Sequence, residues 1–289
     1  MFDCRKTYRR VGVTFPHQVC VNRTVAKLNA RDEARRAARE VDGTNPADYS
    51  EALERGLLVL TAFDRTEERL TQAQLARKLD LPRATVRRAL LTLTHLGYVI
   101  PDDKAYRLGP KVLTLASAYL TTNPVSHVVQ PVCDGLAEQL QASCTAAVLD
   151  GPSAVMIARA LPRHALPIGQ GIGFHVPATK SALGLVLLSG LDEERRHRHL
   201  VAHSGLDEEA VAALEKKIAA VAAAGHSYVA HEVEQGFHSI AVPLRRWDGT
   251  AIAALNIGTS VERTSEVDMR ERVLPLLAET AGKLQPQLV

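Results

Sequence analysis

Apolar positions between Thr71 and Leu108 follow a helical spacing twice and then an extended one. Leu75 and Leu79 lie four residues apart, and the next apolar set repeats at i, i+4 and i+7. That second set is Val86, Leu90 and Leu93. The pattern therefore predicts two short helices, which are followed by a β-hairpin.

The residues at the ends of these elements support the same order. Thr71 can cap the first helix, since its hydroxyl can accept a hydrogen bond from an unpaired backbone N–H. Pro82 cannot continue that helix but suits the first turn of the next one, which Gly97 then closes. Two runs, Tyr98–Ile100 and Ala105–Leu108, predict the strands of a hairpin. This order is typical of a winged helix-turn-helix, whose second helix enters the DNA major groove.

The second predicted helix carries a polar, arginine-rich face opposite its apolar one. Arginine can make paired hydrogen bonds to guanine, and threonine can contact a thymine methyl group or a phosphate. Such a helix, taken alone, is more often a solvated surface helix, but the turn before it and the hairpin after it favour DNA binding. The residues expected to contact double-stranded DNA are Arg83, Thr85, Arg87, Arg88, Thr92 and, at the hairpin tip, Lys104.

Outside this segment the pattern predicts a second, larger domain. A helix over Glu51–Ala62 should bury Leu53, Leu57 and Leu60 and complete a three-helix core, and a helix over Pro110–Leu120 should link the domains. Beyond it, hairpins alternate with helices, which indicates an α+β domain with an antiparallel sheet. Helices on one side of such a sheet can leave a small-molecule pocket on the other. The expected strands are 144–149, 154–160, 239–244 and 251–258, and the expected helices are 179–189, 208–224 and 265–284, the last interrupted by Pro275.

Charge is distributed unevenly along the 289 residues, whose net charge is +3. Residues 71–109 hold seven Lys/Arg and three Asp, the first 45 hold ten basic and five acidic residues, and the remainder hold 18 basic and 24 acidic ones. Positive charge is thus concentrated where nucleic acid would bind. The expected domains are a basic extension (1–46), a winged helix-turn-helix domain (47–109), a linker helix (110–123) and an effector domain (124–289).

The first 46 residues lack an apolar face that could pack. They are expected to be a disordered tail or an over-long start of the reading frame, or else a basic arm that adds nonspecific DNA affinity.

Composition excludes several other classes of protein. Only 4% of residues are aromatic, which argues against stacking on single-stranded bases. No apolar run reaches the roughly 18 residues needed to span a bilayer, and no signal-peptide core is present, so a cytoplasmic protein is expected. The four cysteines lack zinc-site spacing, which indicates ordinary reduced thiols and no metal or cofactor. They are Cys4, Cys20, Cys133 and Cys144.

Three stretches of the chain resemble the IclR family of bacterial transcriptional regulators. They are the winged helix with LGYVI and YRLGPKVLTL, then GFHVPATKSALGLVLLSGL (173–191), and then EQGFHSIAVPLRRWDGTAIAALNIG (234–258). The resemblance covers about residues 51–284 and implies a GAF-like effector-binding domain. RATVRRALLTLTHLGYV and SCTAAVLDG are most similar to the branch that controls protocatechuate and para-hydroxybenzoate catabolism. The resemblance implies a regulator that binds operator DNA as a dimer or tetramer and responds to a small carboxylate, either aromatic or short and aliphatic, with protocatechuate or para-hydroxybenzoate as the first expectation.

The resemblance also implies where the effector binds. Ser239, Asn256 and Gly258 match effector-facing positions, and Ser and Asn side chains can donate hydrogen bonds to a carboxylate or phenol. The helix start at Thr179 and Ser181 should favour an anion. The further cationic candidates are His238, His175 and Arg159.

Departures from the family fall on a few positions. Asp80 stands where the family often has Gly, and an Asp tolerates the left-handed conformation at small cost. Leu185 replaces an Arg, and Phe237-His238 replaces the usual Leu-Arg pair. The last two changes concern the identity of the ligand rather than the fold.

Two other functions stay open at this point. An architectural DNA-binding protein without an effector would leave the large second domain unexplained, and a saturable ligand response would separate it from a regulator. A hydrolase would need a triad such as Ser181, His238 and Asp150, but no G-x-S-x-G elbow surrounds the serine. We therefore expect a regulator and no enzyme.

Overall fold

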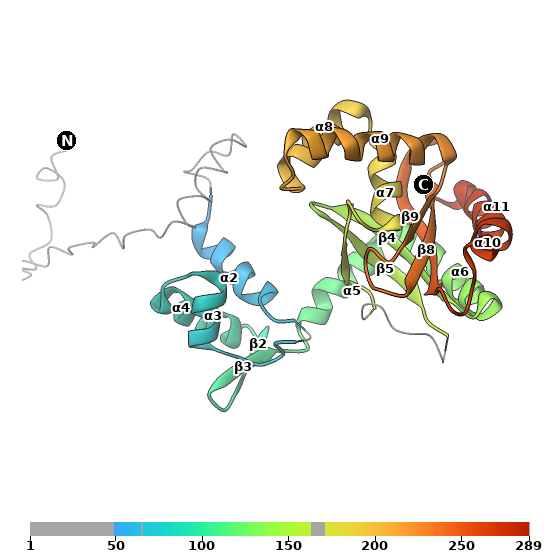
Figure 1. Cartoon of the computed structure of the whole chain (residues 1–289). Coiled ribbons are helices and arrows are strands. Elements are labelled where there is room, and N and C mark those ends of the chain that lie inside the picture. The colour runs from blue at the N-terminus through green and yellow to red at the C-terminus, as the bar shows by residue number, and fades with distance from the viewer. Residues whose placement is uncertain (1–48, 65, 163–170, 289) are drawn as a thin grey trace, which may run out of the picture. The chain divides into compact units, whose positions relative to one another are not determined.

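A computed structural model describes residues 49–64, 66–162 and 171–288 of the chain. The chain divides into two compact units, Met1–Val112 and Leu113–Val289 (Figure 1). The extension expected at residues 1–46 lies outside the described residues. Each unit is described by itself below.

The described part of the first unit is a winged helix-turn-helix, as the sequence predicts. Its elements are α2 (Glu51–Thr61), β1 (Leu70–Thr71), α3 (Gln72–Leu79), α4 (Arg83–His95), β2 (Val99–Asp102) and β3 (Ala105–Leu108). The three strands pair antiparallel in the order β1-β3-β2, and the short β1 is an addition to the expected hairpin. Residues from all three helices and from the wing form one apolar core.

Local chemistry fixes the helix ends of this unit. Thr71 and Gln74 form a capping box at the start of α3, where each side chain bonds the other's backbone. Asp80 ends α3 with a φ of 49°, the left-handed conformation expected of it. Gly97 has a φ of 80°, and the Tyr98 N–H reaches the carbonyl of Leu93 at 2.9 Å, which closes α4.

Of the three leucines of α2 expected in the core, Leu60 packs against it, but Leu53 and Leu57 do not. Val59 and Ala62 are buried, whereas Leu53 and Leu57 are 64% and 51% exposed. Leucines occur on more than one side of this helix, so the apolar spacing alone could not select the buried face. Contact with α4 selects the face that carries Val59.

The second unit holds a six-stranded antiparallel sheet in the order β6-β5-β4-β9-β8-β7. Its strands are β4 (Ser143–Asp150), β5 (Ser153–Ala160), β6 (His175–Pro177), β7 (Ser227–Ala230), β8 (Phe237–Arg245) and β9 (Ala251–Ser260). Its helices are α5 (Val112–Thr122, which starts at the boundary), α6 (Pro124–Leu140), α7 (Ala182–Ser189), α8 (Glu193–His203), α9 (Glu208–Ala224), α10 (Glu266–Asp268) and α11 (Leu274–Leu284). The α+β class and the antiparallel sheet are confirmed, while α6, α8, β6 and β7 were not foreseen.

Helices cover both faces of this sheet, where the sequence suggested cover on one side only. One core joins the sheet to α6 and α11, and a second joins its other face to α7 and α9 (Figure 1). A ligand site on either face of this sheet therefore lies between the sheet and a helix layer.

The C-terminal helical segment passes its proline without a break. Residues 269–273 form a π-helical turn between α10 and α11, and Pro275 falls at the start of α11, where a missing N–H costs least. Among the described residues, none of the helices combines the length and the apolar character that crossing a bilayer requires.

Candidate DNA-binding face and effector cavity

The candidate recognition face is the exposed side of α4. Val86, Leu90 and Leu93 anchor the helix in the core, and this leaves the opposite side chains in solvent. Of the expected DNA contacts, Arg83, Arg87, Arg88, Thr92 and Lys104 are exposed and Thr85 is half-buried. The structure thus gathers five of the six on one helix, with Lys104 in the wing turn.

The cations of this face are available to a partner. Among the described residues, Arg83, Arg87, Arg88 and Lys104 form no ion pair, unlike Arg69 in the same unit. The Thr92 hydroxyl donates to the Arg88 carbonyl at 3.0 Å, so its oxygen keeps acceptor capacity for an outside donor. Unpaired guanidinium groups on an anchored helix can bind phosphates or base edges without first breaking another bond.

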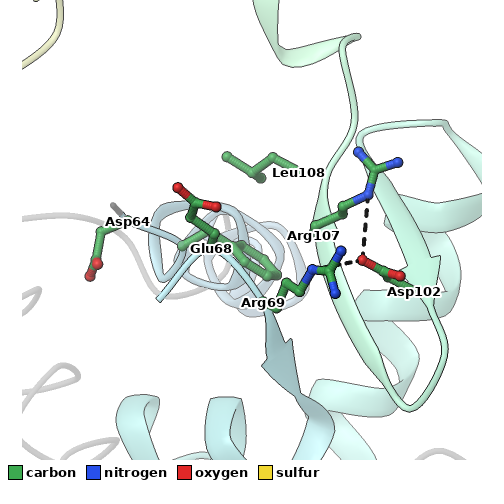
Figure 2. Close-up of a pocket in the computed structure, with 7 residues that line it drawn as sticks. Asp64, Glu68, Arg69, Asp102, Arg107 and Leu108 are labelled. Carbon is green, nitrogen blue, oxygen red and sulfur yellow. Dashed lines mark ion pairs between the residues drawn. The ribbon is translucent and has the colours of Figure 1, made fainter. Parts of the chain in front are cut away.

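An open hollow of about 560 Å³ lies at the base of the wing. Figure 2 shows Arg69 and Arg107 directed toward Asp102, whose Oδ2 lies 2.9 Å from Nε of the first and 3.7 Å from Nε of the second. Asp64 and Glu68 also line it, so the hollow is mixed in charge and gives no preference for an anion. We infer that these ion pairs link both wing strands to the segment before β1 and stabilise the base of the wing.

A second, smaller cavity lies in the second unit between the sheet and α7. Paired residues of neighbouring strands form its floor. In the first row, Ser143 and Ser239 both pair with Gly258, and two residues along β9, in the second row, Thr145 pairs with Asn256. Arg159 of β5 pairs with Thr145 and extends the second row. The full lining is Ser143, Thr145, Met156, Arg159, Val176, Ser181, Leu183, Val233, Phe237, Ser239, Asn256 and Gly258.

This cavity floor is buried and polar. Ser143, Thr145, Ser239 and Asn256 are each less than one-tenth exposed. Within the described part of the chain, none of these four side chains makes a hydrogen bond to another group. None of their polar atoms is among the fully buried atoms that lack a partner in the described residues, so these atoms keep access to the cavity. A row of four polar side chains that face a cavity without protein partners indicates a place for a ligand or for ordered water.

Arg159 supplies the positive charge at one end of the floor. Its backbone N–H and carbonyl are held by the side-chain amide of Gln130, at 3.0 Å each, and its Nη1 lies 3.3 Å from Sδ of Met156. Burial lowers the pKa of the guanidinium from its ordinary value, but an arginine stays protonated at neutral pH. The sequence offered Arg159 only as a further cationic candidate.

The structure assembles four of the six expected effector residues and leaves out two. Ser181, Ser239, Asn256 and Gly258 line the cavity, whereas Thr179 and His238 do not. The Ser181 hydroxyl is already committed, since it donates to the Pro177 carbonyl at 2.8 Å and accepts from the Gly184 N–H at 3.1 Å. It caps α7, so any contact it makes to a ligand is secondary.

His238 lies on the opposite face of the sheet. Side chains alternate along a strand, so His238 shares its side with Ile240 and Val242, which belong to the core under α6 and α11. Its Nδ1 lies 2.9 Å from the Tyr228 hydroxyl. The expectation of a cationic effector contact there is corrected: burial lowers the pKa of His238, which favours the neutral ring.

Several cavity residues were not foreseen from the sequence. Ser143 and Thr145 had a usable signal, because two hydroxyl residues at i and i+2 in a predicted strand share one face. The apolar walls come from separate elements and carry no such signal. They are Met156, Val176, Leu183, Val233 and Phe237.

Comparisons with known proteins agree with both units. Residues 117–285 match the family model "Bacterial transcriptional regulator IclR C-terminal", and residues 52–103 match the "IclR helix-turn-helix domain". The chain is 35% identical over 254 residues to the Pca regulon regulatory protein of Pseudomonas putida, a match that covers 85% of this chain and 86% of that one.

Two solved structures extend the comparison. A putative transcriptional regulator, RHA06195 from Rhodococcus sp. RHA1, is 35% identical with a TM-score of 0.70, over 83% of this chain and 98% of that one. The inducer-binding domain of a PobR double mutant from Acinetobacter, in complex with 3-hydroxybenzoic acid, is 30% identical with a TM-score of 0.51. That match covers 56% of this chain and 97% of that one.

Proposed function

This chain belongs to the IclR family, whose members are transcriptional regulators and not enzymes, and we propose that it regulates aromatic-acid catabolism genes in response to a small aromatic carboxylate. The observation that carries the proposal is the row of buried, unpartnered polar side chains beside Arg159. A ligand that suits it needs an anionic end, a flat apolar body and further hydrogen-bonding groups. Hydroxybenzoates have all three.

We assign each part of such a ligand to part of the cavity. The carboxylate is placed against Arg159, where Thr145 and Asn256 can donate hydrogen bonds to it. The ring lies against the apolar walls, and a ring hydroxyl meets Ser143 and Ser239 across Gly258. The PobR domain with 3-hydroxybenzoic acid and the Pca regulon relative support this class of ligand. Para-hydroxybenzoate and protocatechuate are the first candidates.

The DNA-binding side of the proposal rests on α4 and on self-association. One recognition helix covers only a few base pairs, so a specific operator calls for two half-sites about one helical turn apart and a dimer or tetramer to bind them. Helix α5 supports self-association, because none of its residues is buried and Leu113 and Leu115 are 65% and 55% exposed. A second copy of the chain would cover these side chains.

Calorimetric titration tests the effector class. Para-hydroxybenzoate and protocatechuate are titrated into the wild type and into the variants Ser239→Ala and Asn256→Ala, with Ser227→Ala as the matched control. Ser227 is a buried strand serine that does not line the cavity. We expect binding tighter than millimolar, a loss of about fivefold in each cavity variant, as one hydrogen bond is worth about 1 kcal/mol, and no loss in the control.

Two results would contradict the proposal in different ways. If no aromatic acid binds more tightly than millimolar, the effector class is wrong and an architectural DNA-binding protein becomes the better account. If an acid binds equally well to all variants, an effector exists but occupies another site.

A further inference from the structure

The ring of Phe237 lies directly on Gly258 in the cavity floor. A Cβ atom added to Gly258 would be 2.3 Å from Cζ of Phe237, closer than any real contact of this kind. The register explains the contact: Phe237 pairs with Ser260 and Ser239 pairs with Gly258, so Phe237 and Gly258 are diagonal neighbours on one face. The tip of an aromatic side chain thus fills the centre of the floor.

The cavity that remains is too small for an aromatic ring. Its volume is about 30 Å³. A protein cavity that binds benzene has roughly 150 Å³, and one water molecule needs about 10–15 Å³. A hydroxybenzoate can therefore enter only if a side chain of the wall moves.

Of the apolar wall residues, Val233, which is 38% exposed, and Phe237 lie outside the buried core, and Phe237 is the one whose ring lies on Gly258. Leu183, Val176 and Met156 are at most 5% exposed and belong to the core between the sheet and α7. Phe237 is only half-buried, at the first position of β8. Apart from its chain neighbours, Gly236 has no atom within 4 Å of an added Cβ, so the chain just before Phe237 is not packed on that side.

Hydrogen bonds fix the backbone of Phe237, whereas its phenyl side chain can make none. Its carbonyl accepts from the His231 N–H at 2.8 Å, and its N–H donates to the Glu234 carbonyl at 3.2 Å. A change of side-chain rotamer would move the ring off Gly258 without breaking either bond.

We infer that the Phe237 ring is a plug that occupies the seat of the effector's own ring, and that residue 237 therefore sets the size of aromatic acid the cavity accepts. This inference rests on the proposed function. When the effector binds, its ring takes the place of the phenyl group on Gly258, and the phenyl group turns off the cavity floor into another rotamer.

A purely structural role of the Phe237 ring leads to a different prediction. An aromatic side chain laid diagonally over a strand glycine stabilises a sheet by itself. A structural phenyl group would stay in place when the ligand binds, and its removal would lower stability without widening the range of ligands. Ring position and ligand size are therefore the two quantities to measure.

The first measurement follows the ring directly. The full-length protein contains five phenylalanines, so uniform labelling with 4-fluorophenylalanine gives a simple fluorine NMR spectrum, in which Phe237→Leu identifies the resonance of Phe237. We expect saturating para-hydroxybenzoate to shift this resonance and to leave that of Phe174 in place. Phe174 lies in the same unit, outside the cavity lining. An unshifted Phe237 resonance at saturation would overturn the plug.

The second measurement follows ligand size. Benzoate, para-hydroxybenzoate and 2-naphthoate are titrated into the wild type, Phe237→Ala and the matched control Phe174→Ala. We expect Phe237→Ala to bind the benzoates about tenfold more tightly and to accept the naphthoate, which the wild type and control reject.

The outcomes separate the plug from the proposed function. If the wild type binds benzoates and Phe237→Ala shows the same affinities and the same size limit, the plug is wrong and the effector class stands. If neither protein binds any of the acids, the proposed effector class is wrong, and the proposed role of Phe237 is wrong with it.

Discussion

The hydroxyl oxygen of Tyr228 lies 2.9 Å from Nδ1 of His238 and joins β7 to β8 on the sheet face away from the cavity under α7. The Arg270 guanidinium lies over the Tyr228 ring, 4.7 Å from its centre. His238 is 1% exposed, and its Nε2 has no hydrogen-bond partner among the described residues. The buried imidazole is therefore a neutral structural group. The loss of folding stability on its protonation can be measured.

Stability should fall as the pH drops below about 6.5 because of His238. Burial lowers its pKa from the ordinary 6.5, an effect that the negative Glu266 opposes and that His231 adds to. Between the two pKa values the unfolded chain binds more protons than the native one, so acidification favours unfolding. Urea midpoints at pH 7.5, 6.5 and 5.5 should show a shallower pH dependence in His238→Gln.

A control variant isolates this contribution. His175 is exposed, so His175→Gln should keep the wild-type pH dependence. His199 also has a pKa lowered by burial, so part of the slope should survive in His238→Gln. Equal slopes in the wild type and in His238→Gln would contradict the assignment of a neutral buried ring.

Loss of Arg88 should weaken binding to specific duplex DNA. If its guanidinium contacts a base, Arg88→Ala should cost about 1–3 kcal/mol and relax specificity at one position. If it contacts a phosphate, the slope of log affinity against log salt should fall by about one. Fluorescence anisotropy on a duplex selected from random sequence measures both quantities.

The matched control for this experiment is Arg195→Ala. Arg195 is an exposed arginine of α8, outside the helix-turn-helix, so its loss should leave affinity and salt slope unchanged. Full affinity in the double variant Arg87→Ala/Arg88→Ala would show that α4 is not the recognition helix.

Substitution of two helical glycines by alanine should change folding stability in opposite directions. A Cβ on Gly184 would lie 2.2 Å from the backbone of Ala178, so Gly184→Ala should destabilise the second unit by about 3 kcal/mol or more. Gly135 is exposed in α6 with no atom within 4 Å of an added Cβ, and Gly135→Ala should stabilise by about 0.5–1 kcal/mol. Thermal unfolding of the two variants measures both, and destabilisation of equal size would contradict the packing described for α7.

Local sequence patterns predict the first unit well because its signals are local. The cap at Thr71, the left-handed Asp80 and the glycine at position 97 each act within a few residues of the helix end they define. The buried face of α2 was predicted only in part because leucines occur on several sides of it, and only contact with α4 distinguishes them. Helix α6 was missed because Pro131 lies inside it and interrupts its helical signal.

The proposed effector cavity depends on contacts that no single segment encodes. Ser239 and Asn256 were expected from a family resemblance, but the place of Arg159 beside Thr145 follows from strand pairing, which apolar spacing cannot give. From the sequence, both Ser239 and His238 were expected to face the cavity. Adjacent residues of a strand point to opposite sides of the sheet, so the cavity takes Ser239 and not His238. The contact of Phe237 with Gly258 likewise appears only once the register is known.

The central claim is that an aromatic acid in the second unit controls DNA affinity, and one linkage measurement tests it most directly. The Kd for the selected duplex is measured without acid and with saturating para-hydroxybenzoate, in the wild type and in Asn256→Ala. The account predicts a change of about 5- to 150-fold in the wild type, and an equal change in acid affinity when DNA is saturating. At the same acid concentration the change should be smaller in Asn256→Ala. An unchanged Kd for DNA at saturating acid would contradict the account.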